Sequence, residues 1–161
     1  NSFFRENADG YTAPFPALLT PESVALGVDA KDAEEAIQRA GELLVASGNA
    51  KEAYVDAMVD AYRSLGPYMV IAPGLAMPHA RPSGSVTRPC ISLLTLAEPV
   101  AFGHPTNDPA SVVIALGGTT DEGHLELLQA LASALAIPNV VKRLHDAEDY
   151  ENVLEILEEG E

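Results

Sequence analysis

Two histidines, His79 and His124, are the side chains of this sequence most able to do chemistry. His79 lies in the segment 73–82, where three prolines and a glycine stiffen the backbone and disfavour a helix. Such a frame suits an imidazole that must be aimed at a reacting atom, although a lone histidine on an apolar face is more often a core residue. His124 begins a segment with helical spacing, on the same stripe as the core leucines, and is therefore predicted to point inward. Beside the carboxyl end of a strand, this helix start would suit an anion such as phosphate, with simple helix capping as the alternative.

Two arginines and two further histidines are weaker candidates. Arg81 and Arg88 flank the His79 loop and could neutralise a phosphoryl group, the alternative being surface ion pairs, especially for Arg88. His104 lies in a polar loop between two expected strands. His145 is expected to be a solvated residue at the end of a helix.

The motifs of several common chemistries are missing from the sequence. Metal ligation by His79, His104, His124 and Asp108 is conceivable, but no histidine pair has i, i+4 spacing and no Cys-x-x-Cys occurs, so no metal is expected. The sequence has neither a Gly-x-x-x-x-Gly-Lys-Ser/Thr loop nor a Gly-x-Gly-x-x-Gly fingerprint. A Gly-x-Ser-x-Gly elbow is missing as well. What remains is a histidine nucleophile with a second histidine and a few arginines near it.

The composition limits the classes of partner. The chain has 161 residues, enough for one domain with a sizeable core, and a formal net charge of −15. With 9 Lys+Arg against 24 Asp+Glu it has no basic stripe, so no nucleic-acid partner is expected. The single cysteine, Cys90, lies in an apolar run and should be an inert buried thiol. Without a membrane-spanning run or a signal-peptide core, the protein is expected to be cytoplasmic.

The hydrophobic pattern predicts an α/β layered sandwich. The strand candidates are nearly continuous apolar runs, which indicates a sheet covered by helices on both faces. Residues 1–19 show little periodicity and are expected to form an N-terminal arm, with one domain over residues 20–161. The expected strands are 24–28, 68–72, 89–96 and 112–116; the expected helices are 33–44, 54–65, 122–136, 139–145 and 147–159.

The segment 73–82, Pro-Gly-Leu-Ala-Met-Pro-His-Ala-Arg-Pro, resembles a known phosphorylation site. It is similar to that of the EIIA components of the bacterial sugar phosphotransferase system, in the mannitol/fructose (type-2) family. The runs 66–74 and 107–109 look most like the ascorbate branch, and the similarity covers about residues 20–159.

This resemblance implies a mixed β-sheet and a relay without a cofactor. It implies that His79 accepts a phosphoryl group from the phosphohistidine of HPr and passes it to a cysteine of an EIIB protein, so that the membrane component EIIC is reached only indirectly. His124 matches the second active-site histidine of the family. Mannitol-type members carry an arginine where this chain has Ala61, a departure that fits the ascorbate branch.

Two other functions remain open from the sequence. One is a regulatory module in which phosphorylation of His79 reports sugar flux to a transcription factor or an enzyme. The other is a histidine-based metal hydrolase. Transfer to an EIIB protein would distinguish the carrier from the first, and elemental analysis would distinguish it from the second.

Overall fold

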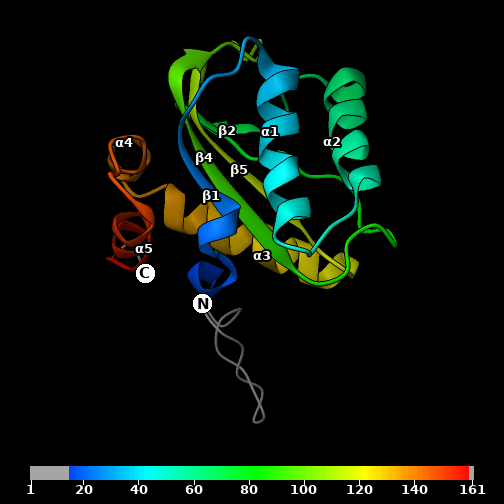
Figure 1. Ribbon diagram of the computed structural model, residues 1–161. Coiled ribbons are helices and arrows are strands. Elements are labelled where there is room, and N and C mark those ends of the chain that lie inside the picture. Colours follow the sequence, from blue (N-terminus) through cyan, green and yellow to red (C-terminus); the bar gives the residue numbers. More distant parts are fainter. Residues whose placement is uncertain (1–14, 160–161) are drawn as a thin grey trace.

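A five-stranded mixed sheet forms the centre of the protein in the computed structural model, which describes residues 15–159 (Figure 1). The strand order is β1-β4-β5-β3-β2. The strands are β1 (Val24–Val28), β2 (Val70–Ala72), β3 (Leu75–Ala76), β4 (Cys90–Val100) and β5 (Ala110–Gly117). The helices are η2 (Phe15–Leu18), η3 (Pro21–Ser23), α1 (Ala33–Ala46), α2 (Glu52–Leu65), α3 (Asp121–Leu135), α4 (Val140–His145) and α5 (Tyr150–Glu159).

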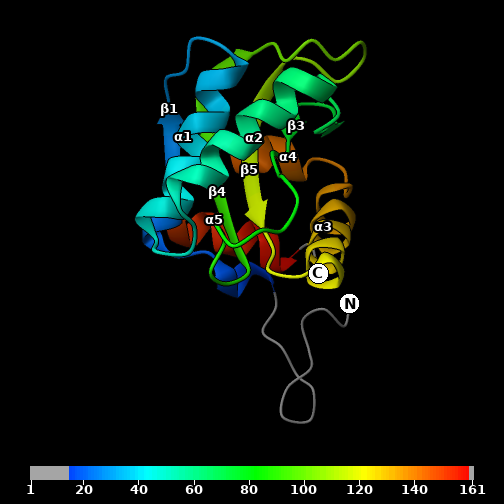
Figure 2. The same cartoon turned by 90° about the vertical axis from the view of Figure 1, so that its right-hand side faces the viewer.

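The central strand β5 joins the two halves of the sheet. It pairs antiparallel with β4, with Cys90 opposite Gly117, and parallel with β3, with Leu75 opposite Val112. β1 pairs parallel with β4, and β2 pairs antiparallel with β3. Because β3 and β5 run in the same direction, the segments that follow them emerge at the same end of the sheet (Figure 2).

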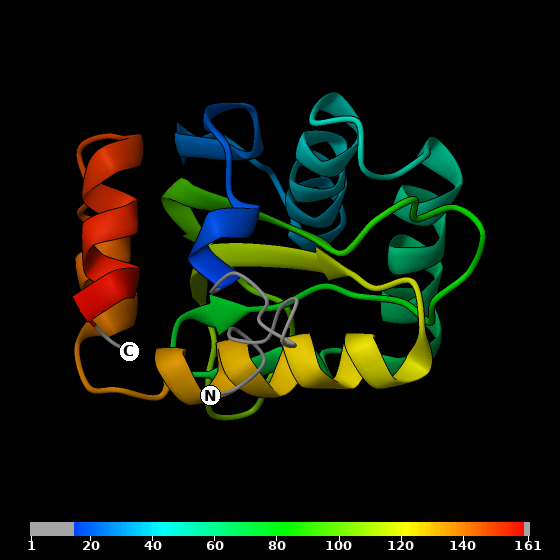
Figure 3. The same ribbon diagram turned by 90° about the horizontal axis from the view of Figure 1, so that it is seen from below.

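Helices cover both faces of the sheet, as the continuous apolar strands predict. α1 and α2 lie on one face, and α3 lies on the opposite face with α4 and α5 (Figure 3). The core divides accordingly into two clusters, one with buried residues of α1 and α2 and the other with buried residues of α3, α4 and α5. The predicted α/β sandwich is confirmed.

Local hydrogen bonds explain where two of the helices begin. The Asp32 carboxylate accepts from the amide of Glu35 at 2.9 Å at the start of α1. The Thr120 hydroxyl accepts from the amide of Gly123 at 3.0 Å at the start of α3. The second cap fixes the first turn of α3, which carries His124.

The structure differs from the sequence expectations in several places. The strand expected over residues 68–72 begins only at Val70. The short strand β3 was not expected, and β4 continues to Val100 instead of ending near residue 96. Phe15 and Leu19 are buried in the core beside α3 and α5, so this end of the expected arm packs against the domain. Residues 1–14 of that arm lie outside the described residues. No helix among residues 15–159 is long and apolar enough to cross a membrane.

Candidate functional site

Main-chain hydrogen bonds hold the segment that carries His79. The amide of Met77 donates to the carbonyl of Met69 at 2.9 Å, which ties the segment to the start of the β2–β3 hairpin. The amide of Leu116, in β5, donates to the carbonyl of Pro78 at 3.2 Å. The residues just before His79 are therefore fixed to the sheet on two sides.

Two tyrosines hold the residues at and after His79. The Tyr68 hydroxyl donates to the carbonyl of His79 at 2.8 Å. The Tyr54 hydroxyl, from α2, accepts from the amide of Ala80 at 3.0 Å and donates to the carbonyl of Leu116 at 2.7 Å. Tyr54 is completely buried, and burial raises the pKa of its hydroxyl. The hydroxyl therefore stays protonated and continues to link α2, β5 and the loop.

The imidazole of His79 has one nitrogen engaged by the backbone. Its Nδ1 lies 2.8 Å from the carbonyl oxygen of Met77. A carbonyl only accepts hydrogen bonds, so Nδ1 carries the proton and the lone pair of the neutral ring is on Nε2. Burial lowers the pKa of His79 below its ordinary value, while the bond to Met77 acts in the opposite sense. The ring is therefore largely neutral at pH 7, with Nε2 available as a nucleophile.

His124 lies beside His79, as the two sequence positions suggested. The two ring centroids are 5.4 Å apart, and the ring planes are inclined by 50°. Burial and repulsion from His79 lower the pKa of His124, and Asp121 opposes the shift. Its Nδ1 is buried without a hydrogen-bond partner among the described residues. An orphaned lone pair costs less than an orphaned N–H, which favours the Nε2–H tautomer, a donor suited to a phosphoryl oxygen.

Gly118 is required for the position of His124. A Cβ added at Gly118 would lie 2.7 Å from the Cβ and 2.8 Å from the Cα of His124. The chain can turn from β5 into α3 this closely only because residue 118 has no side chain. The pair of imidazoles therefore depends on this glycine as well as on the Thr120 cap.

The arginines give no comparable geometry. Arg81 and Arg88 are both exposed, and within residues 15–159 neither makes a hydrogen bond or an ion pair. Their contribution to a phosphate site stays a prediction. Ala61 lies in α2, so the described site has no cation at the position of the mannitol-type arginine.

The other two histidines lie toward the opposite end of the sheet. His104 is in the loop between β4 and β5, where its Nδ1 accepts from the amides of Thr106 and Asn107 at 3.2 and 3.0 Å. The expectation that His145 is a solvated residue at the end of a helix is met only in part. Its side chain is 34% exposed, and its Nε2 lies 2.9 Å from the carbonyl oxygen of Leu96, because α4 packs against β4.

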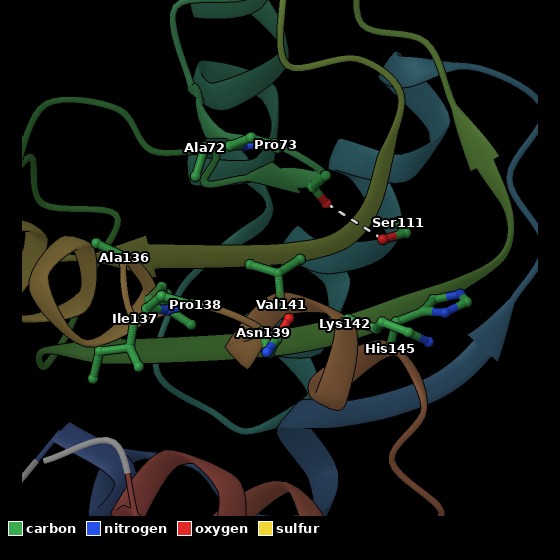
Figure 4. Close-up of a pocket in the computed structure, with 12 residues that line it drawn as sticks. Ala72, Pro73, Ser111, Ala136, Ile137, Pro138, Asn139, Val141, Lys142 and His145 are labelled. Atoms are coloured by element: carbon green, nitrogen blue, oxygen red, sulfur yellow. Dashed lines mark hydrogen bonds between the residues drawn. The ribbon is translucent and has the colours of Figure 1, made fainter.

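An open pocket of about 430 Å³ lies at this opposite end and includes neither His79 nor His124. Figure 4 shows the side chains of Lys142 and His145 at one side of it and Ser111 at another. Lys142 is paired with Asp146 at 3.0 Å. Among residues 15–159, no three His, Cys, Asp or Glu side chains come together as a set of metal ligands, here or at His79.

Sequence reasoning missed the two tyrosines of the site. The sequence pattern places Tyr68 in a strand and Tyr54 on the apolar face of a helix, and both positions account for the aromatic ring but not for the hydroxyl. The partners of the Tyr54 hydroxyl lie 26 and 62 residues away in the chain, so no local pattern could indicate them. For Tyr68, its place in the run 66–74 that resembles the ascorbate branch was the one available signal.

The chain is similar to a known protein family and to named proteins within it. The family model "Phosphoenolpyruvate-dependent sugar phosphotransferase system, EIIA 2" matches residues 17–160. The ascorbate-specific PTS system EIIA component of Escherichia coli K12 is 34% identical over 137 residues, which are 85% of this chain and 84% of that protein. The ascorbate-specific component of Salmonella typhimurium is 38% identical over 69% of this chain and 72% of its own.

Solved structures show the same fold. The crystal structure of IIA mannitol from Escherichia coli has a TM-score of 0.76 at 32% identity and covers 86% of this chain and 98% of its own. The complex of enzyme IIAMTL with phosphorylated enzyme IIBMTL from Escherichia coli has a TM-score of 0.77 at 31% identity. It covers 88% of this chain and 97% of its own.

Proposed function

Because this chain belongs to the type-2 EIIA family of the sugar phosphotransferase system, we propose that it carries its phosphoryl group on Nε2 of His79. Members of this family are cytoplasmic phosphotransferase components that work through a phosphohistidine. The observation that carries the assignment is the bond from His79 Nδ1 to the Met77 carbonyl, which leaves the lone pair on Nε2 of a ring that lies beside the ring of His124. HPr is the proposed donor, and an EIIB cysteine is the proposed acceptor.

The transfer into His79 requires only bond exchange at phosphorus. The Nε2 lone pair attacks the phosphorus of the donor phosphohistidine while the donor N–P bond breaks and its electron pair returns to the donor ring. The proton of His79 stays on Nδ1 and keeps its hydrogen bond to the Met77 carbonyl, which stabilises the positive charge that develops on the ring. In the second transfer a thiolate sulfur attacks the phosphorus, and the electron pair of the N–P bond returns to Nε2.

His124 is the proposed stabiliser of the transferring group. Its Nε2–H can donate to an equatorial phosphoryl oxygen, and its Nδ1 is not held by another group of the described chain. Arg81 and Arg88 are proposed to add positive charge around the loop, as exposed groups that a docked partner would desolvate. Substituting either arginine by Gln should lower the transfer rate by only a few-fold, and more at low salt.

The sugar served by this carrier is proposed to be ascorbate. The support is the resemblance of the runs 66–74 and 107–109 to the ascorbate branch, together with identities of 34 and 38% to ascorbate-specific components. Alanine at position 61 is a further difference from mannitol-type members.

Reconstitution of the relay tests the proposal. The protein is incubated with phosphoenolpyruvate, the general enzyme and HPr, and then with ascorbate-type or mannitol-type EIIB. We expect a mass increase of one phosphoryl group, mapped to His79, and faster transfer to the ascorbate-type EIIB. Labelling elsewhere would contradict the site, equal transfer would contradict the specificity, and labelling without any transfer would favour the regulatory module.

A further inference from the structure

Tyr68 makes two contacts with His79, and neither has a part in the proposed bond exchange at phosphorus. Its hydroxyl donates to the carbonyl of His79 at 2.8 Å. Its ring meets the imidazole edge-on, with centroids 5.2 Å apart and planes inclined by 78°. The ring centroid of His124 is 5.4 Å from that of the same imidazole, so the His79 ring has two aromatic neighbours, Tyr68 and His124.

These contacts restrict the two motions that could misplace Nε2. Rotation of the peptide after His79 would break the hydroxyl–carbonyl bond, and rotation of the imidazole would drive it into the ring of Tyr68. Tyr68 is 37% exposed and lies outside the helices and strands, so core packing does not by itself explain its orientation. The Tyr68 hydroxyl could form a hydrogen bond to water with a similar enthalpy. Its bond to the His79 carbonyl instead fixes the orientation of the side chain.

We propose that Tyr68 is a positioning residue for phosphoryl transfer. Before the donor docks, its hydroxyl and ring already hold the imidazole of His79 in the orientation that Nε2 needs to attack phosphorus. The proposal rests on the function proposed above. A group held in advance lowers the barrier of the bound complex, so its loss lowers the transfer rate at saturating donor and leaves the donor KM nearly unchanged. A residue used only for docking would do the reverse.

The chain contains a matched control for this arrangement. The Tyr62 hydroxyl donates to the carbonyl of Phe102 at 2.8 Å, and its ring meets the Phe102 ring edge-on at 5.7 Å and 79°. Tyr62→Phe therefore removes the same kind of bond at a residue with no chemistry. Tyr68→Phe removes the hydroxyl alone, and Tyr68→Ala also removes the ring.

The experiment measures transfer from phospho-HPr by rapid quench across a range of HPr concentrations, with thermal unfolding of each variant. Nitrogen-15 NMR shifts of the His79 ring report its tautomer. We expect the saturating rate to fall about 5–10-fold in Tyr68→Phe and about 100-fold in Tyr68→Ala. The KM for phospho-HPr should stay within about two-fold of that of the unsubstituted protein. The nitrogen-15 shifts of the His79 ring should move toward those of a mixture of tautomers. Tyr62→Phe should transfer at the original rate.

Three outcomes would overturn the proposal. An unchanged saturating rate in both Tyr68 variants removes the positioning role, and a raised KM with an unchanged rate assigns Tyr68 to docking. An equal loss of the saturating transfer rate in Tyr62→Phe would show that the slower transfer comes from lost stability and not from positioning. Failure of the proposed function is seen separately, because the unsubstituted protein would then take no phosphoryl group.

Discussion

The histidines at the two ends of the sheet differ in which ring nitrogen the backbone engages. At the end where β3 and β5 finish, His79 Nδ1 meets the Met77 carbonyl, so the proton is on Nδ1 and the lone pair on Nε2. In the loop before β5, His104 Nδ1 accepts two backbone amides, so its proton is on Nε2. The backbone group that bonds Nδ1 thus decides whether Nε2 of the same ring is a nucleophile or a hydrogen-bond donor.

The largest expected difference between the two ends is in phosphoryl acceptance. His79→Ala should abolish labelling from phospho-HPr, because it removes the nitrogen that bonds to phosphorus. His104→Ala should keep full labelling, because Nε2 of that ring carries a proton. Intact mass measured after incubation checks both variants, and a His79 variant that still gained a stoichiometric phosphoryl group would contradict the comparison.

The next effect concerns the partner imidazole. His124→Gln should leave the acceptor in place but slow transfer about 100-fold, since one preorganised donor to the phosphoryl oxygens is lost or displaced. Single-turnover quench measurements give the rate. His145→Gln serves as the control at the other end, where the ring bonds Leu96, and its transfer rate should not change.

A smaller effect is expected where β5 turns into α3. Gly118→Ala places a methyl group 2.7 Å from the Cβ of His124, so the first turn of α3 must shift. We expect destabilisation of about 1–3 kcal/mol from overpacking and transfer slowed roughly 10-fold. Urea unfolding and quench kinetics measure the two effects; Gly84→Ala, where an added Cβ meets nothing within 4 Å, is the control.

The smallest effect is the dependence of stability on pH. The folded protein lowers the pKa of His79 and His124, so at pH values just below about 6.5 the unfolded chain binds more protons. The stability present above the unfolded pKa should therefore be lost as the pH falls through the folded values. Urea midpoints at pH 7.5 and 5.5 measure this loss, which should shrink in the double variant His79→Gln, His124→Gln. An identical loss in both proteins would assign it to other groups.

The sequence predicts this fold well because its strong signals are local. The apolar stripes of α1, α2 and α3 and the continuous strands β4 and β5 each show their character within one window. The strand β3 has two residues between Gly74 and the prolines, too few for any periodicity, and it exists through its pairing with β5. Phe15 and Leu19 were misjudged because their partners in the core come from the far end of the chain.

The site was predictable in its residues but not in its hydrogen bonds. His79 and His124 stand out through the proline frame and the helix start. The hydrogen bond of His145 is to a carbonyl 49 residues away, and the tyrosine hydroxyls bond groups 11 to 62 residues away. Contacts of this range are set by the tertiary structure, which is why the tautomer of each histidine could be assigned only from the structure.

The place of β5 between β3 and β4 has a consequence for the chain during synthesis. β3 and β4 do not pair with each other, so the sheet is in two pieces until β5 enters between them. A nascent chain that has emerged only through residue 109 holds the nucleophile without the Leu116 amide or the second imidazole. Such long-range pairings form slowly, so competence for phosphorylation arises only as the fold closes. A stalled ribosomal product that ends before β5 is therefore expected to accept no phosphoryl group on His79.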